Sequence, residues 1–257
     1  MKRLNTLAAV ALAVAVTIPA LAQTARRTTA LSFASDYQTV PVMANTTGVN
    51  GATFQTYVAL LNPTSSAFTV SATLYDAAGV KHDAIISLAA GELKTYQNFL
   101  DAVFHYSGGG AVTFRSPEST GGQHNNRFVV TAEVWTTTNS GRFGTPISVL
   151  EFAGTASRSF SGGITVDSNS RTNVGCFNQS DAANRVKATV LDATGKLVLG
   201  SVDLNLAANG WSQTALTTIV SGGSVQFDPS DSAVCYAVVV DNRTNDGRFV
   251  SAAEYTP

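Results

Sequence analysis

The sequence of 257 residues has few of the side chains that most often carry chemistry. It holds two cysteines and three histidines, and only 13% of its residues are charged. His82, His105 and His124 are not spaced to form a metal-binding face or a helical pair. No Gly-x-Ser-x-Gly segment occurs, and no pair of carboxylates stands in a setting typical of glycosidases. We therefore expect no metal, no cofactor and no enzyme activity, with a hydrolase assembled only in the folded chain as the most distant alternative.

Clusters of positive charge and long apolar runs are also scarce. Apart from the pairs Lys2-Arg3 and Arg26-Arg27, Lys and Arg are scattered singly, whereas proteins that bind nucleic acid or anionic membranes usually carry basic patches. An uncharged and mainly apolar run, Leu7 to Leu21, follows Lys2 and Arg3 and ends beside Ala22. This pattern predicts a signal peptide over residues 1–22 that is cleaved after Ala22. An uncleaved membrane anchor is the alternative.

Cleavage would leave about 235 residues, with 14 basic and 17 acidic side chains and a net charge near −3. The first of these residues is Gln23 and not cysteine, so the lipid that anchors many exported bacterial proteins has no attachment site. We expect a secreted or periplasmic protein that has no nucleic-acid partner and does not insert into a membrane after cleavage.

Alternation of apolar and polar residues predicts strands along most of the remaining chain. Phe68, Val70, Ala72 and Leu74 alternate with small polar residues, which is the period of a strand with one buried face. Further strands are predicted over 54–62, 80–88, 92–97, 110–115 and 127–138, with a single short helix over 98–105. The expected fold class is therefore all-β.

An internal repeat sets the number of domains. At an offset of 116 residues Asn62 matches Asn178, Asp76 matches Asp192, and Gly79 matches Gly195. The match continues, with small insertions at turns, through residues 109–114 with 222–227 and 141–143 with 247–249. Ordered matches with gaps at turns indicate a duplicated domain. We expect two tandem immunoglobulin-like or fibronectin-like β-sandwich domains, arranged as a linker over 23–37, a first copy over 38–150, a linker over 151–157, a second copy over 158–253 and a tail over 254–257.

The two cysteines both fall in the second copy. In the repeat alignment Cys176 takes the place of Leu60, and Cys235 takes the place of Val130. Both places point inward, and an exported protein with two cysteines is expected to form a disulfide. In the chain-entropy treatment a loop of this length contributes about 4 kcal/mol to stability. Two buried thiols or a metal pair are the alternatives.

Two tryptophans invite a comparison with proteins that stack sugars on exposed aromatic rings. Trp135 aligns with Val240, and Trp211 aligns with Leu93, so both places are apolar in both copies and packing is the favoured role. Strand parity nevertheless puts Trp135 on the outer face of its strand, which makes it our candidate ligand-binding residue.

In the second copy the outer face of the corresponding strand is entirely apolar. A strand that is apolar on both sides is normally covered on both sides. We expect this row to form an interface with the first domain, or otherwise with a partner protein; its members are Val234, Tyr236, Val238 and Val240.

The segments TYVALLNPT (56–64), VSATLYDAAG (70–79) and VVVDNRTNDGRFV (238–250) resemble those of secreted bacterial proteins that carry tandem β-sandwich repeats. The resemblance implies the repeat unit but no activity or site residue. The expected function is a non-catalytic extracytoplasmic module for structure, adhesion or surface assembly, with a protein or another cell-surface component as partner. The alternative is binding of a glycan or small ligand near Trp135 or the glycine-rich segments 107–110 and 221–223.

Overall fold

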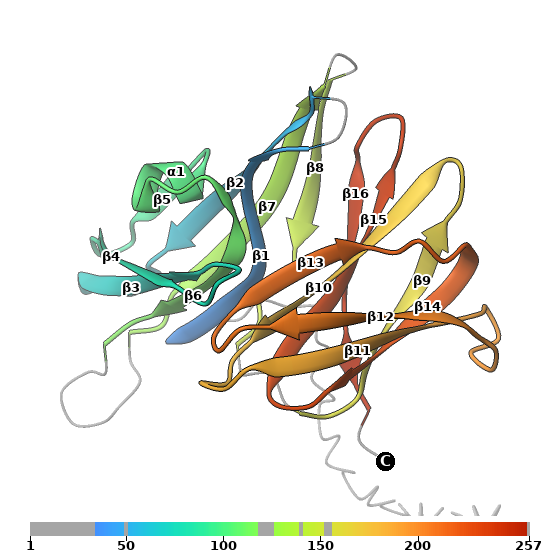
Figure 1. Cartoon of the computed structure of the whole chain (residues 1–257). Helices are drawn as coiled ribbons and strands as arrows, with labels where there is room; N and C mark the ends of the chain where they lie inside the picture. The colour runs from blue at the N-terminus through green and yellow to red at the C-terminus, as the bar shows by residue number, and fades with distance from the viewer. Residues whose placement is uncertain (1–33, 49–50, 118–125, 139–140, 152–155, 256–257) are drawn as a thin grey trace, which may run out of the picture.

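The computed structural model describes residues 34–48, 51–117, 126–138, 141–151 and 156–255 (Figure 1). The predicted signal peptide lies outside these residues. The described part of the chain forms seventeen strands and one short helix, which confirms the all-β class. No helix within it has both the length and the apolar character needed to cross a membrane.

The first half of the chain contains eight of these strands and the helix. In chain order they are β1 (Tyr37–Thr47), β2 (Thr53–Leu61), β3 (Phe68–Tyr75), β4 (Lys81–Leu88), β5 (Leu93–Tyr96), α1 (Phe99–Phe104), β6 (Gly108–Arg115), β7 (Val129–Thr138) and β8 (Gly141–Ile147). The strands and the helix predicted from periodicity in this half are confirmed, with ends that differ by one or two residues.

The second half follows with nine strands. They are β9 (Ser159–Val166), β10 (Ser170–Asn178), β11 (Asn184–Leu191), β12 (Val198–Leu206), β13 (Trp211–Ala215), β14 (Val220–Pro229), β15 (Ala233–Asp241), β16 (Gly247–Ser251) and β17 (Ala253–Glu254).

Both halves build two facing layers of strands with the same order, but in the first half β1 connects the layers into one eight-stranded sheet. In the second half the sheets are β13-β10-β15-β16 and β12-β11-β14-β9-β17, and every pairing is antiparallel. In the first half β5, β2, β7 and β8 take the places of the first of these sheets, and β4, β3, β6 and β1 take the places of the second. Corresponding strands thus occupy corresponding places, as a duplicated fold requires.

The two sheets of the first half are joined by β1. Its early part pairs with β6 from Tyr37 to Asn45, and its last residues pair with β2 from Asn45 to Thr47. The register with β6 shifts between Val40 and Met43, around Pro41. Proline has no backbone N–H to give to a ladder and is tolerated in strands at such bulges. The second part of β1, from Val42 onward, lies on the side of the first sandwich that faces β10 and β15 of the second.

Strand parity places the expected side chains in the cores. Val70, Ala72 and Leu74 in β3 have no exposed surface, and the same holds for Val186, Ala188 and Val190 at the equivalent places of β11. Two buried clusters result, one centred on each half of the chain, and the first also includes Tyr236 of the second half.

A buried asparagine is repeated with its hydrogen bonds. The side-chain amide of Asn62 donates to the carbonyls of Ser66 and Ala89, each at 2.8 Å. Asn178 donates in the same way to Ala182 at 2.8 Å and Ala207 at 2.7 Å, and its Oδ1 accepts the Ser180 N–H. Each asparagine therefore ties two loops at one end of its sandwich.

Replacing Asn178 with alanine is expected to lower the free energy of unfolding by about 2–3 kcal/mol, because buried carbonyls would lose their donors. Chemical denaturation measures this change. Asn169→Ala is the matched control, since that residue is exposed and its side chain makes no hydrogen bond to the described residues; a change there within about 0.5 kcal/mol is expected. Equal losses in the two variants would contradict the role assigned to Asn178.

The predicted disulfide is confirmed. Cys176 and Cys235 are bonded, and they are direct partners in the β10–β15 ladder with their Cα atoms 4.1 Å apart. Leu60 and Val130 are direct partners in the β2–β7 ladder, at the equivalent place of the first half. Since disulfides persist mainly in oxidising compartments, the bond indicates an extracytoplasmic protein.

Two predicted segment ends need correction. Residues 23–37 are predicted as a linker and 254–257 as a tail, yet Tyr37 is in β1 and Glu254 is in β17, which pairs with Ser159. The pairing of β17 covers only two residues, so it leaves no alternation that a sequence pattern would reveal.

Candidate functional site

The two sandwiches pack side by side, with the outer face of the sheet β13-β10-β15-β16 turned toward the first sandwich (Figure 1). Because side chains alternate along a strand, one face collects every second residue of β10, β13 and β15. Arg171 lies opposite Val240, Asn173 opposite Val238, and Gly175 opposite Tyr236. These residues form the second sandwich's side of the contact.

Tyr236 is the central residue of this contact. It has no exposed surface and belongs to the buried cluster of the first sandwich, against which Val238 and Phe249 also pack. Its ring stacks on Phe249 with the ring centroids 5.2 Å apart. Gly175 is required beside it, because any Cβ there would overlap the phenol. Of the predicted interface row, the structure thus places Tyr236 and Val238 against the first sandwich.

The hydroxyl of Tyr236 is held in a short chain of hydrogen bonds. Trp211 Nε1 donates to the tyrosine oxygen at 3.1 Å, and that hydroxyl donates to Gln213 Oε1 at 3.0 Å. Burial raises the pKa of the Tyr236 phenol. The group is therefore a neutral structural donor and not a base.

Trp211 reaches across the contact as well. Its ring lies over Gly109 of β6, where a Cβ would come within 2.8 Å of the indole. The first glycine-rich segment predicted near a ligand site is thus beside Trp211. Leu93, its counterpart in the first copy, is 60% exposed, so the alignment of two apolar residues at this place does not mean that both are packed.

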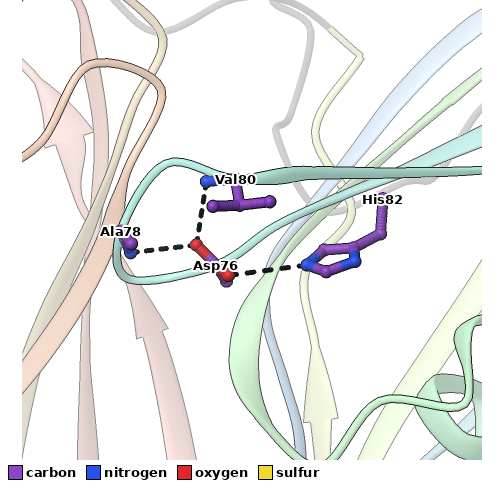
Figure 2. A network of polar contacts seen from close by, with 4 residues as sticks. All are labelled: Asp76, Ala78, Val80 and His82. Carbon is purple, nitrogen blue, oxygen red and sulfur yellow. Dashed lines mark hydrogen bonds and ion pairs between the residues drawn. The ribbon is translucent and has the colours of Figure 1, made fainter.

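The β3–β4 hairpin docks on the second sandwich. Asp76 closes the hairpin, since its Oδ1 accepts the N–H groups of Ala78 and Val80 at 2.9 Å, and its Oδ2 lies 3.5 Å from His82 Nε2 (Figure 2). The carbonyl oxygen of Asp76 accepts the backbone N–H of Trp211 at 3.0 Å. His82 therefore contacts the residue that closes this hairpin, and the same residue binds the backbone of Trp211.

A cavity of about 460 Å³ lies between the two sandwiches. Its lining is mainly apolar, and strands from both halves contribute. The apolar side chains that line it include Val42, Met43, Phe54, Val134, Ile147, Trp211, Val238 and Val240.

The polar side chains of the lining come mostly from one sheet and the loop beside it. They are Thr46 and Thr145 from the first half and Arg171, Asn173, Gln213 and Asn245 from the second. Arg171 is the one charged residue among the described residues that line the cavity.

Arg171 is fixed by neutral partners. Its Nη1 donates to Asn242 Oδ1 at 3.1 Å and its Nη2 donates to Asn245 Oδ1 at 2.8 Å. Within the described part of the chain, no carboxylate lies within ion-pair distance of this guanidinium. Burial lowers the pKa of Arg171, which Asp241 partly offsets, but a guanidinium stays protonated at any physiological pH. The site therefore holds a half-buried positive charge whose hydrogen-bond partners are neutral.

Trp135, the candidate ligand-binding residue, is not among the residues that line the cavity. Its indole N–H donates to the Gln97 carbonyl at 3.1 Å, and the guanidinium of Arg142 lies over the ring at 3.9 Å from its centroid. A sugar that stacked on the same face of the ring would have to displace Arg142.

Sequence reasoning reached the apolar row of the cavity wall but missed Arg171. The parity of β10 puts this charge on the same face as Asn173 and Gly175, beside the predicted apolar row of β15. Arg171 is the one charged residue of β10, and this isolated charge is the feature of the sequence that points to the site. Among the residues that the structure covers, no group of three or more His, Cys, Asp or Glu side chains is arranged to hold a metal.

Comparisons with known proteins give little for this chain. No protein-family model matches it, and no curated protein does. Among solved structures, a Bacteroides uniformis β-glucuronidase 2 covalently bound to cyclophellitol-6-carboxylate aziridine is similar at 12% identity and a TM-score of 0.18, over 78% of this chain and 24% of that enzyme.

Two further solved structures give similar values. A Bacteroides uniformis β-glucuronidase has 12% identity and a TM-score of 0.17, with 78% of this chain and 24% of the other covered. A glycosyl hydrolase family 2 member from Bacteroides cellulosilyticus DSM 14838 has 5% identity and a TM-score of 0.18, with 77% and 26% covered. The chain thus spans about a quarter of the length of these enzymes, and likeness at such scores carries no argument about function.

Proposed function

We propose that this protein is a non-catalytic, secreted or periplasmic binding module that holds a small, mainly apolar ligand between its two sandwiches. The cavity of about 460 Å³ carries this proposal. Ligand sites are typically 300–1,000 Å³, are lined mainly by apolar side chains with a few polar groups, and often lie between domains. The space between the sandwiches has all three properties.

The lining favours an apolar ligand over a glycan. A sugar needs many hydrogen-bonding partners, whereas Val42, Ile147, Val238 and Val240 offer none. Binding of a glycan near Trp135 has less support, because Arg142 already lies over that ring.

A structural, adhesion or surface-assembly role is the function expected first from the sequence. That expectation rests on the class of fold, which proteins of many unrelated functions share. The cavity, in contrast, is a defined place with a size, a lining and a charge. For this reason we place ligand binding first.

The neutral fluorophore 1-aminoanthracene tests the proposal, because its emission rises when it enters an apolar site. The mature protein is expected to bind it saturably with one site per chain. Val238→Trp fills the cavity from its wall and is expected to weaken binding by roughly tenfold or more.

Two controls accompany this variant. Val198→Trp adds the same side chain at a residue that is 61% exposed and outside the lining, and should leave binding unchanged. Val238→Ala keeps the cavity open and should retain binding. Saturable binding that Val238→Trp leaves intact, or no saturable binding by the mature protein, would refute the proposal.

A further inference from the structure

The cavity between the sandwiches is lined by a charged residue and by an aromatic residue that lie far apart. Arg171 and Trp211 both line it, and Trp211 is the ladder partner of Phe177 on the same strand as Arg171. Six residues of β10 separate the two places, which corresponds to about 20 Å along a strand. A ligand long enough to reach both places would contact a guanidinium at one of them and an indole at the other.

Around Arg171 the surroundings are polar. Asn245, which binds the guanidinium, is buried and lines the cavity. Thr145 of β8 lies beside Gly247, two residues further on, where a Cβ would overlap the threonine hydroxyl. Around Trp211 the lining is formed by Met43 and Gly109 of the first sandwich.

The guanidinium still has donors to offer. It has five N–H groups, and the two asparagine side chains engage one through each of Nη1 and Nη2. Asparagine oxygens are neutral, so these bonds orient the charge without cancelling it. A half-buried charge is stabilised by an opposite charge beside it; Asp241 interacts with Arg171 from a distance, but none of the described carboxylates is close enough to form an ion pair.

We propose, on the basis of the function proposed above, that the ligand is an elongated amphiphile with one carboxylate, whose head group binds Arg171 and whose apolar body extends toward Trp211. A carboxylate matches the planar fork of a guanidinium and accepts two parallel hydrogen bonds. One negative charge neutralises the one positive charge of the lining. A dianion such as a phosphate monoester would leave one negative charge without a cationic partner in the lining, which is costly.

Displacement of 1-aminoanthracene by two probes with the same chain tests the inference. Decanoate carries the carboxylate, and decan-1-ol has a neutral head. The mature protein is expected to bind both. In the Arg171→Gln variant the affinity for decanoate is expected to fall by roughly tenfold to a hundredfold, since a hydrogen-bonded charge is lost, while the affinity for decan-1-ol changes by less than about threefold.

Arg243→Gln is the matched control. It removes the same charge from the β15–β16 loop, but Arg243 is exposed and does not line the cavity, so both affinities should stay as in the unchanged protein. Arg171→Lys keeps the charge without the planar fork and should restore part of the affinity for decanoate. Misfolding of Arg171→Gln would weaken the binding of decan-1-ol as much as that of decanoate, so the decan-1-ol measurement detects it.

The outcomes separate the two proposals. If decan-1-ol binds but decanoate does not, or if Arg171→Gln and Arg243→Gln have the same effect on decanoate, the carboxylate inference is wrong and the cavity remains a binding site. If neither probe nor the fluorophore binds, the proposed function fails and the inference fails with it. Tighter binding of decyl phosphate than of decanoate would replace the carboxylate with a phosphate.

Discussion

Removing the disulfide by replacing both Cys176 and Cys235 with alanine is expected to lower the free energy of unfolding by about 4 kcal/mol. The bond closes a loop with a sequence separation of 59 residues. In the chain-entropy treatment a crosslink over such a loop restricts the unfolded chain much more than the folded one. Denaturation in guanidinium chloride, followed by circular dichroism, gives the change.

The first sandwich supplies a second variant that separates the covalent bond from the volume it fills. Cys176→Leu with Cys235→Val installs the pair that Leu60 and Val130 form at the equivalent place. If the crosslink dominates, this variant stays within about 1–2 kcal/mol of the alanine variant, because only packing differs. A protein that loses less than about 1 kcal/mol in both variants would contradict the entropic account.

The same pair of ladders shows what the sequence can predict. The repeat offset aligns Cys176 with Leu60 and Cys235 with Val130. In the structure Cys176 pairs with Cys235 in one ladder, and Leu60 pairs with Val130 in the equivalent ladder. Periodicity likewise predicts six of the eight strands of the first half, but not β1 or β8, and it predicts the buried face of β3. These features are local, or are copied from one half to the other, so a single sequence contains them.

The order of strands was not predictable in this way. The first part of β1 pairs with β6, and its last residues pair with β2, so one strand connects two sheets. Alternation tells which face of a strand is buried but not which strand lies beside it. The same limit applies to β17, whose two residues pair with β9.

The candidate site was predictable only in part. The apolar row of β15 indicated a covered face, because the corresponding row of the first copy contains Thr131 and Glu133 in place of Tyr236 and Val238. The cavity depends in addition on β1, β8, β10 and β13, which lie far apart in the chain. Their convergence follows from how two folded units dock, and no local pattern encodes it.

Replacing Tyr236 with alanine is expected to lower the free energy of unfolding by about 3–5 kcal/mol, the range for large aromatic side chains in a core. The ring has no exposed surface and fills space between the sandwiches. Its loss also leaves the Trp211 indole N–H without its acceptor. Tyr236→Phe removes the hydroxyl alone and should lower the free energy of unfolding by about 1 kcal/mol.

Tyr255, which is 57% exposed, provides the control, and its replacement by alanine should change stability by less than about 1 kcal/mol. Because Tyr236 belongs to the second sandwich and is buried in the core of the first, its removal should also uncouple them. Unfolding of Tyr236→Ala followed by Trp135 fluorescence in a Trp211→Phe background, and by hydrogen exchange of β11 and β14, should then give two different midpoints. Coincident midpoints with a loss below about 1 kcal/mol would mean that the two units are held together by other contacts, such as the Asp76 hairpin.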